Sequence, residues 1–593
     1  MAGGAVSEES GPHGSGLQLG MSARLAVAAN NAANTLAGAV MKTTTDLLRA
    51  FIIWSALTLA SFNLQAAKEP LYDGLGSYSR KITTDSPEAE RYFNQGLAFV
   101  HGFNYNAAIR AFRQAAELDP KCAMAHWGIA LANGPHINFA LVPPPAAELA
   151  WKEIALAREH AAKASPVERA LIDALAKRYA NPQPEDRSPL DRAYADAMRE
   201  VWKKFPKDPD VGAFFAEAMM DLRPWDQWTP DGTAQPGTDE ILATLDAVLS
   251  SNPKHPFANH LYIHAVEASP HPERANAAAD RLRNLQPGVS HNVHMPSHID
   301  IRIGRWQQAV EANLNAVAAD ARYRKIFGPA KGFLNVYVAH NRHMLAYCAM
   351  MTGQRDLAMK QIRAMVAELP ADFLKENPLQ AEGFVAMPLE VMVRFGLWDE
   401  ILAEPDHYAD YMPFTHAFHH AARAVAYAAK GDAANARKAQ SVFLERARLV
   451  PKEDSLGNNS CETILGIVTP MIEGEILVAE NKIDGGIEQL RAAIKKEDGL
   501  KYDEPPGWLI PVRHSLGAVL MKQRRFAEAE QVYRDDLARL PENGWSLLGL
   551  AESLREQKKN EMEAKATKAS FQRIWAKADL KITSSCLCQP AMN

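Results

Sequence analysis

Residues 89–120 read AERYFNQGLAFVHGFNYNAAIRAFRQAAELDP, and this stretch decides the fold. Apolar and small residues recur at intervals of four and three residues, the spacing of one buried helix face. Small residues stand where a second helix would have to approach closely, and a proline ends the pattern because it cannot continue a helix. The stretch therefore predicts two antiparallel helices in close contact. The residues that carry the pattern are Tyr92, Gly96, Phe99, Ala108, Phe112, Ala115 and Pro120.

This spacing resembles the 34-residue unit of the tetratricopeptide repeat (TPR) family. The resemblance implies a right-handed stack of helix pairs with a concave groove. Similar turns that lead into a second helix recur along the chain, and no alternating strand pattern of useful length is present. We therefore predict an all-α fold, an α-solenoid of TPR-like repeats. The turns are GRWQQA (304–309), GQRDLA (353–358), GDAANA (431–436) and QRRFAEA (523–529), with the weaker versions GLWDEI (396–401) and NKIDGG (481–486).

Composition excludes some functions. The 593 residues are 47% hydrophobic and 23% charged, which is ordinary for a folded chain, and the net charge is −5. No basic footprint for nucleic acid or for an anionic membrane surface is present. At this length a repeat array or several domains are expected.

The N-terminal residues have the order of a secretory signal. Lys42 and Arg49 precede an apolar run over residues 50–62, and small residues follow it. The run is short for a membrane span, so we expect cleavage near Ala67 or Lys68, no transmembrane span in the mature chain, and a periplasmic or secreted protein. The alternative is an uncleaved anchor. Residues 1–40 are rich in Gly, Ser, Ala and Asn and are consistent with a start site placed too early.

The breaks between repeats predict the following organisation. It has a disordered extension (1–40), a signal peptide (41–67), N-terminal TPR-like repeats (68–225), central histidine-rich repeats (226–450), C-terminal repeats (451–580) and a tail (581–593).

Histidine recurs in register through the central repeats. Nine of the 19 histidines lie in residues 255–343. Two of them, His260 and His264, precede His294 and His298 by one 34-residue unit. His291 and His294 precede His340 and His343 by a second common interval. Counted within the repeat, these seven side chains occupy positions 2, 5 and 9 of three successive first helices. In the TPR family those positions line the groove.

Such a cluster suits a transition metal. Neutral imidazole is a common ligand of Cu, Fe and Zn, and an i, i+4 pair on one helix can bind one ion. We predict His260, His264, His291, His294, His298, His340 and His343 as candidate ligands. Glu267, Asp300 and Tyr347 are candidates to orient the rings from outside the coordination shell.

A proline interrupts the second of these three helices. Pro296 cannot donate a helical hydrogen bond, so the helix either kinks there or begins near Met295. Farther along the chain, Trp508 and Arg513 are candidates for binding a substrate. Five cysteines are too few for a disulfide framework, and Cys586 and Cys588 either form a local bridge or stay free.

Known catalytic motifs do not indicate a reaction. The chain contains no GxSxG, P-loop, GxGxxG or HExxH. The HLYIHAVEAS and VHMPSHI segments resemble those of a group of secreted bacterial TPR-like proteins without a settled activity. The resemblance therefore implies a scaffold and a groove, and the reaction has to be argued from the site.

Three functions fit these observations. The first is a secreted or periplasmic metalloprotein with a Cu, Fe or Zn centre, as a metal-dependent oxidoreductase acting on a small molecule. A hydrolase is less favoured because no general-base carboxylate is placed. The second is a scaffold that binds a peptide or protein outside the cytoplasm, and the third is metal storage or delivery. The oligomeric state does not follow from the sequence.

Overall fold

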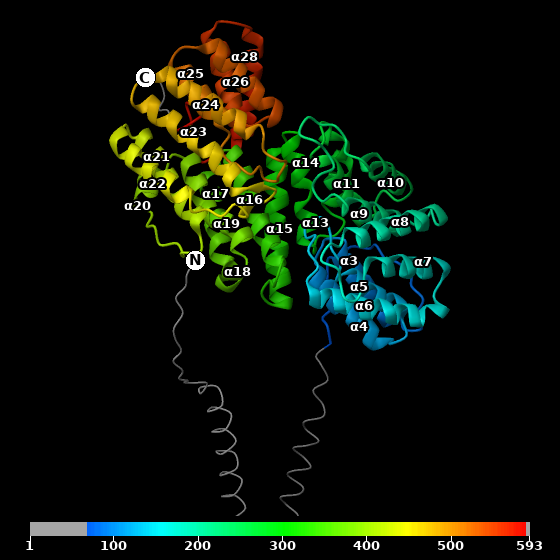
Figure 1. Cartoon of the computed structure of the whole chain (residues 1–593). Helices are drawn as coiled ribbons and strands as arrows, with labels where there is room; N and C mark the ends of the chain where they lie inside the picture. Colours follow the sequence, from blue (N-terminus) through cyan, green and yellow to red (C-terminus); the bar gives the residue numbers. More distant parts are fainter. Residues whose placement is uncertain (1–67, 589–593) are drawn as a thin grey trace, which may run out of the picture. The chain divides into compact units, whose positions relative to one another are not determined.

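The computed structural model describes residues 68–588 of the chain (Figure 1). The predicted extension (1–40), the signal peptide (41–67) and the last five residues of the tail lie outside this range. The described residues from 69 onward form one compact unit. None of the helices in the described range is long and apolar enough to cross a membrane.

Helices account for nearly all of the regular secondary structure in the described residues, which confirms the predicted all-α class. The one sheet in these residues is a hairpin of β1 (Ser455–Leu456) and β2 (Asn459–Ser460). The helices up to the histidine-rich region are α3 Pro87–Val100, α4 Tyr105–Leu118, α5 Ala123–Leu131, α6 Pro144–His160, α7 Pro166–Leu175, α8 Ser188–Lys204, α9 Pro209–Met220, α10 Thr238–Ser251, α11 Pro256–Glu267, α12 Asn276–Leu282, α13 Ser290–His294 and α14 Pro296–Arg302.

The remaining helices continue the same alternation. They are α15 Trp306–Phe327, α16 Leu334–Met351, α17 Arg355–Glu368, α18 Ala371–Glu376, α19 Pro378–Arg394, α20 Trp398–Ala403, α21 Pro413–Ala429, α22 Ala433–Ala447, α23 Cys461–Ala479, α24 Ile483–Glu497, α25 Val512–Lys522, α26 Phe526–Arg539, α27 Gly544–Glu556 and α28 Glu561–Ile574. Four 3₁₀ turns join some of them, at Ala161–Lys163, Ala176–Arg178, Pro272–Ala275 and Trp575–Lys577.

The first helix pair, α3 and α4, packs as the sequence predicts. Ser86 caps α3 by accepting a hydrogen bond from the Ala89 N–H, and Asn104 caps α4 in the same way. Gly96 faces the Phe112 ring so closely that a Cβ there would lie 2.5 Å from it. A small residue at this position is therefore what allows the two helices to touch.

The turns between paired helices use a left-handed residue. Gly304 and Gly353 have φ of +80° and +70°, values that glycine adopts without steric cost. They stand directly before α15 and α17, and the other predicted turns likewise lead into α20, α22, α24 and α26. Paired helices such as α3 with α4, α16 with α17 and α23 with α24 are in extensive contact. The α-solenoid of TPR-like helix pairs is thus confirmed.

Two apolar cores run through the compact unit. The first spans residues 72–299 and adds Tyr323 and Tyr337, and the second spans residues 301–554. The boundary falls within α14, where Ile299 belongs to the first core and Ile301 to the second, and α16 contributes side chains to both cores. The histidine-bearing helices α11, α13, α14 and α16 therefore lie where the two cores meet.

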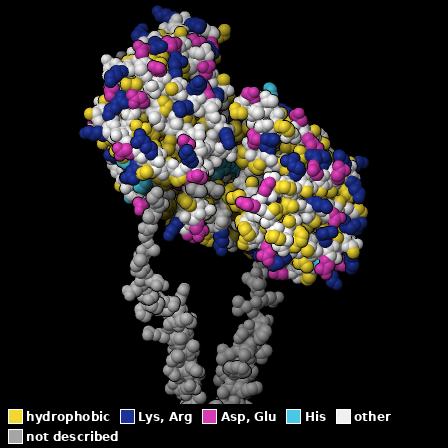
Figure 2. Space-filling model, in the orientation of Figure 1, with side chains coloured by type: hydrophobic (Ala, Val, Ile, Leu, Met, Phe, Trp, Pro, Cys, Tyr) yellow, Lys and Arg dark blue, Asp and Glu magenta, His cyan; other side chains and the backbone are white. Residues whose placement is uncertain are grey.

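Surface charge is mixed. On the face shown in Figure 2, Lys and Arg side chains alternate with Asp and Glu rather than gathering into one basic area. This agrees with the small net charge of the chain and does not suggest a nucleic-acid surface.

Candidate metal centre

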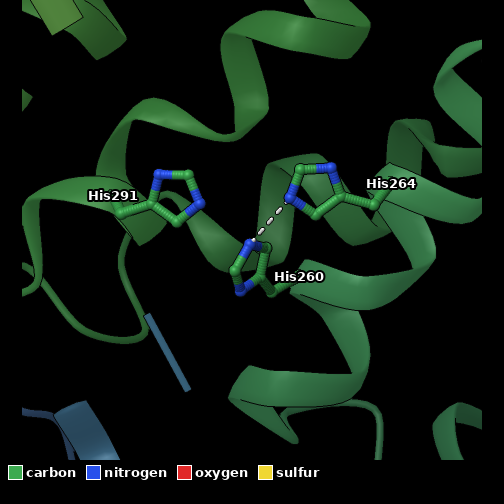
Figure 3. A group of neighbouring side chains, drawn as sticks. All are labelled: His260, His264 and His291. Atoms are coloured by element: carbon green, nitrogen blue, oxygen red, sulfur yellow. Dashed lines mark hydrogen bonds between the residues drawn. The ribbon is translucent and has the colours of Figure 1, made fainter. Parts of the chain in front are cut away.

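Six of the seven predicted histidines come together in two groups of three. The first triad is His260 and His264 from α11 with His291 from α13, and Figure 3 shows these rings facing one another. The second triad is His294 from α13, His298 from α14 and His340 from α16. Within each triad, one ring nitrogen per residue lies within 4.8 Å of the others. The triads adjoin, since the His291 and His294 ring centres are 5.9 Å apart.

The break at Pro296 positions the second triad. α13 ends at His294, and α14 begins at Pro296, so Pro296 occupies the first turn of a helix, where its missing N–H costs nothing. Met295 between them keeps helical dihedrals. His294 and His298 consequently remain about one turn apart across the break, with their Nε2 atoms separated by 2.7 Å.

In the first triad, oxygen atoms hold the Nδ1 side of two rings. His260 Nδ1 lies 2.7 Å from the backbone carbonyl oxygen of His101, and His264 Nδ1 lies 2.7 Å from Glu267 Oε1. A carbonyl oxygen can only accept, so His260 carries its proton on Nδ1. Its Nε2 therefore offers a lone pair, and it lies 3.1 Å from His264 Nε2.

The second triad repeats this arrangement. His294 Nδ1 lies 2.6 Å from Asn313 Oδ1, and Asn313 donates its own amide N–H to the Ala309 carbonyl, which fixes the amide orientation. His294 therefore donates through Nδ1. His298 Nδ1 contacts Glu267 Oε2. One carboxylate thus links the two triads.

These contacts leave nitrogen lone pairs facing each other. When Glu267 is ionised it accepts from both His264 and His298, and all four Nε2 atoms are unprotonated. A protonated Glu267 can donate its single proton to Nδ1 of only one ring, His264 or His298. That ring then carries its own proton on Nε2, so the repulsion between lone pairs is removed in only one of the two pairs. At least one pair of Nε2 atoms therefore presents two lone pairs to each other at 2.7 or 3.1 Å, a repulsive arrangement unless a cation lies between them.

Protons do not supply that cation at neutral pH. Burial lowers the pKa of His264 to about 3 and those of His294 and His298 to about 4. Burial also lowers the pKa of His260, His291 and His340 well below the ordinary value, with neighbouring imidazoles adding to the effect. All six rings are neutral, as metal ligands must be.

The unpaired ring nitrogens of His291 give independent support for a bound metal ion. His291 is 3% exposed, and neither ring nitrogen has a hydrogen-bond partner in the structure. A buried polar group without a partner is costly and is uncommon in native proteins. Its ring centre lies 4.9 Å from that of His260 and 4.5 Å from that of Tyr337. A bound ion would satisfy it.

Several predicted residues are engaged elsewhere. His343 is buried with its ring edge on Phe384 and joins neither triad. Asp300, expected to orient a ligand, instead pairs with Arg283 and Arg305 because these cations are available to its buried carboxylate. Of the remaining candidates, Tyr347 packs on Trp306, Trp508 packs on Phe418, and Arg513 forms a bidentate pair with Asp498.

The predicted ligands also differ from the expectation in their exposure. From repeat positions 5 and 9, these side chains are expected to line the groove. In the structure His260, His264, His294 and His298 are 4% exposed or less. Later helices and the loop carrying Phe103 cover them, and the Phe103 ring centre is 4.6 Å from that of His260.

Some contributors to the site were not found by sequence reasoning. The His101 carbonyl is a backbone atom, and Asn313 lies on the second helix of its repeat, so neither carries a sequence signal. His136 is a further neighbour of the site: its ring stacks on the Phe103 ring, with the ring centres 4.5 Å apart, next to the first triad.

A narrow pocket reaches His291. It is lined by Phe99, Gly102, Tyr323 and Tyr337 among others and contains about 10 Å³ of space, room for about one water molecule. An ion held by three imidazoles keeps coordination positions open, and the pocket would admit only a very small ligand to them.

Comparison with known proteins supports the assignment of tetratricopeptide-type repeats. Residues 89–122 match the family model of the tetratricopeptide repeat, which confirms that resemblance. No curated protein gives a significant match. The resemblance to a secreted histidine-rich group has no support from these comparisons.

Similar solved structures are distant in sequence. The human IFIT1 dimer with m7Gppp-AAAA is 13% identical, covers 84% of this chain and 92% of its own, and has a TM-score of 0.31. The APC/C hetero-tetramer Cut9–Hcn1 is 12% identical, with coverages of 90% and 80% and a TM-score of 0.29. Yeast Tom70 is 13% identical, with coverages of 82% and 92% and a TM-score of 0.28.

Proposed function

We propose that this chain is a transition-metal protein in which the two histidine triads hold two adjacent ions within a TPR-type scaffold. The observation that carries the proposal is the pair of facing Nε2 atoms in each triad, at 3.1 and 2.7 Å. Their Nδ1 atoms are fixed by oxygen acceptors, an arrangement typical of metal-bound histidine.

The type of ligand atom limits which metal ions the two triads can hold. Imidazole nitrogen is the only donor type in both triads, with Glu267 outside the coordination shell. Such ligands suit Cu, Zn and Fe and disfavour Mg and Ca, which prefer oxygen. Cu(II) forms the strongest complexes with nitrogen ligands among these ions. We therefore infer copper first, with iron and zinc as the alternatives.

The surroundings favour oxidoreductase chemistry on a small molecule. Three ligands per ion leave room for a diatomic or a water molecule, and the pocket at His291 has space for little more. A hydrolase would need a general base at the ion. The carboxylate nearest the triads, Glu267, already accepts from two imidazoles. O₂ or a similarly small oxidant is the substrate class that fits.

A peptide-binding scaffold is less well supported. A peptide would need exposed groove residues, whereas five of the six triad histidines are buried, His340 is only partly exposed, and the pocket that reaches His291 is narrow. We also propose that the protein is exported, on the strength of the signal-like residues 41–67. N-terminal sequencing of the exported chain should give a start near residue 67, and a chain that retains residues 1–40 would contradict export by this signal.

The metal proposal is tested by removing one ligand from each triad. Asparagine at position 264 or 298 keeps an N–H near the place of Nδ1, so it preserves the contact with Glu267 and deletes only Nε2. Full-length wild type expressed with Cu, Fe and Zn should contain two ions by elemental analysis. His264→Asn and His298→Asn should each retain about half of that content.

The matched control is His271→Asn. His271 lies just beyond α11, and its side chain is 68% exposed. This variant should keep the wild-type metal content, and circular dichroism should show all three variants folded. A wild type without metal, or equal metal in all variants, would support the peptide-binding scaffold instead. Oxygen consumption with a chemical reductant, lost on chelation and restored by one metal, separates an enzyme from a storage protein.

A further inference from the structure

Residues near the C-terminus are held against the C-terminal repeats by hydrogen bonds. We call residues 579–588 the tail segment. Asp579 accepts hydrogen bonds from the backbone N–H groups of Arg355 and Asp356 and so caps α17. Ser585 donates to the His514 carbonyl oxygen at 2.8 Å, and its own carbonyl accepts from Arg394 at 2.7 Å. These contacts hold the backbone directly before Cys586 in a defined place.

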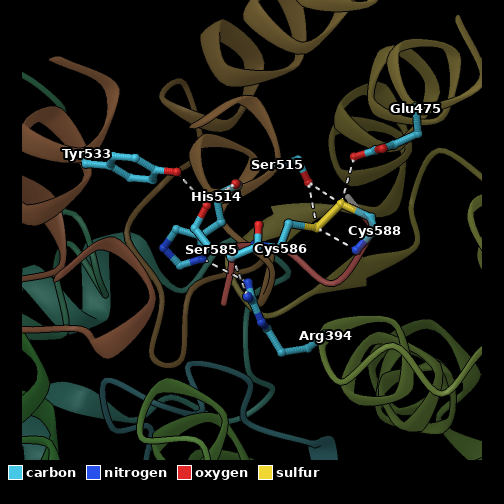
Figure 4. Close-up of a disulfide and its surroundings, with 9 residues drawn as sticks. Arg394, Glu475, His514, Ser515, Tyr533, Ser585, Cys586 and Cys588 are labelled. Carbon is cyan, nitrogen blue, oxygen red and sulfur yellow. Dashed lines mark hydrogen bonds between the residues drawn. A yellow bond between two sulfur atoms is a disulfide. The ribbon is translucent and has the colours of Figure 1, made fainter. Parts of the chain in front are cut away.

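Two buried sulfur atoms follow, beside a carboxylate. Cys586 and Cys588 are 8% and 5% exposed and form a disulfide in the structure. Glu475 Oε1, from α23, lies 3.2 Å from Cys588 Sγ. The Ser515 hydroxyl from α25 lies 3.5 Å from one sulfur and 3.4 Å from the other (Figure 4). Two sulfurs and one carboxylate oxygen are thus within coordination reach of a common point.

Arg394 supplies compensating charge. Its guanidinium is buried on the Trp545 ring and contacts both the tail segment and His514. Two thiolates and one carboxylate around a divalent ion leave one net negative charge, which the guanidinium offsets. Burial lowers the pKa of Arg394 to about 9, so it is still a cation at neutral pH.

We propose that Cys586, Cys588 and Glu475 form a redox-gated site for a borderline-soft divalent ion such as Zn²⁺. The disulfide is the closed form. A dithiol reductant donates two electrons and two protons, the S–S bond breaks, and two thiols form while the reductant becomes a disulfide. Binding of the ion then releases the two thiol protons. Sulfur and carboxylate ligands in this number suit a tetrahedral ion, with Ser515 or water as the fourth ligand.

This inference is independent of the histidine centre. It rests on different residues, and the tail segment contacts α17, α19 and α25 rather than α11, α13 or α14. Its test can therefore fail or succeed whatever the metal content of the triads.

The test uses full-length protein and Co²⁺ as the probe, because thiolate-to-cobalt charge-transfer absorption reports sulfur ligands alone. After anaerobic reduction with dithiothreitol and its removal, the wild type should bind one Co²⁺ at the cysteine site, reported by a thiolate band. The oxidised wild type should show no such band. Cys588→Ser should lose at least half of the band, because one of its two thiolates is gone, and Glu475→Gln should weaken cobalt binding, because a neutral amide oxygen replaces an anionic one.

Two controls complete the design. Cys461→Ser removes a buried free cysteine and should leave the band unchanged. The double variant His264→Asn/His298→Asn should also keep it. The proposal is overturned if reduced wild type gives no thiolate band, if Cys588→Ser retains the full band, or if the disulfide resists dithiothreitol in the folded protein. The comparison of reduced with oxidised wild type needs no variant, so a folding defect cannot mask the answer.

Discussion

Buried histidines occur in both halves of the solenoid, but their partners differ. In the C-terminal half, His514 has both nitrogens satisfied, because Arg394 donates to Nδ1 at 2.9 Å and Nε2 lies 3.0 Å from Asp536. In the histidine triads, only the Nδ1 side of the four paired rings meets an oxygen, and the Nε2 atoms face one another. Burial alone therefore does not mark a metal site. The decisive feature is a second nitrogen that has no protein donor or acceptor suited to it.

The largest effect should come from removing the metal. At free ion concentrations about 1,000 times Kd, each ion stabilises the folded state by about 4 kcal/mol. Chelation should therefore lower the Tm of the wild type strongly. Hydrogen exchange should accelerate in α11, α13, α14 and α16 and stay unchanged in α25 to α27. Uniform acceleration across both halves would contradict a local centre.

Asp536→Ala should cause a comparable loss of stability without any change in metal content. The Asp536 carboxylate is buried and binds His514, Ser546 and Asn543. Removing one partner from a buried charged network costs about 3–5 kcal/mol. Chemical denaturation should show this destabilisation, and elemental analysis should show wild-type metal content. Loss of metal would mean that the two halves are coupled.

An added methyl group between two paired helices should lower stability to a similar extent in both halves. A Cβ at Gly96 would lie 2.5 Å from the Phe112 ring, and a Cβ at Gly517 would lie 2.4 Å from the Tyr533 ring. Both glycines are on the first helix of a pair, and both rings are on the second. Gly96→Ala and Gly517→Ala should each cost about 1–3 kcal/mol through overpacking, measured by denaturant midpoint. A neutral result at either position would show that its ring can move aside.

The smallest effect is expected at Arg513. Its partner Asp498 is one-third exposed, and such partly solvated pairs contribute at most about 1 kcal/mol. Arg513→Gln should change stability by less than this amount and leave the metal content and any oxygen consumption unchanged. Loss of activity in a stable Arg513→Gln variant would restore the hypothesis that this residue binds substrate.

Sequence reasoning located the helix pairs because their signals are local. Small residues such as Gly96 and the turn glycines constrain neighbours a few residues away. The repeat register also brought forward six histidines that the structure places together. It could not show that they are buried, since that depends on how Phe103 and the later helices cover α11. It could not assign Asp300 either, because its two arginine partners follow from packing between helices.

Burial of the ligands has a kinetic consequence. Five of the six triad histidines are buried and His340 is partly exposed, so water has little access to replace the ligands of an enclosed ion one by one. Exchange with the medium then requires local opening of the helices that carry the imidazoles, and its rate follows the free energy of that opening rather than the affinity of the ligands. Isotope exchange of the bound metal should therefore be slow and should speed up with mild denaturant, with a lifetime set by the protein fold.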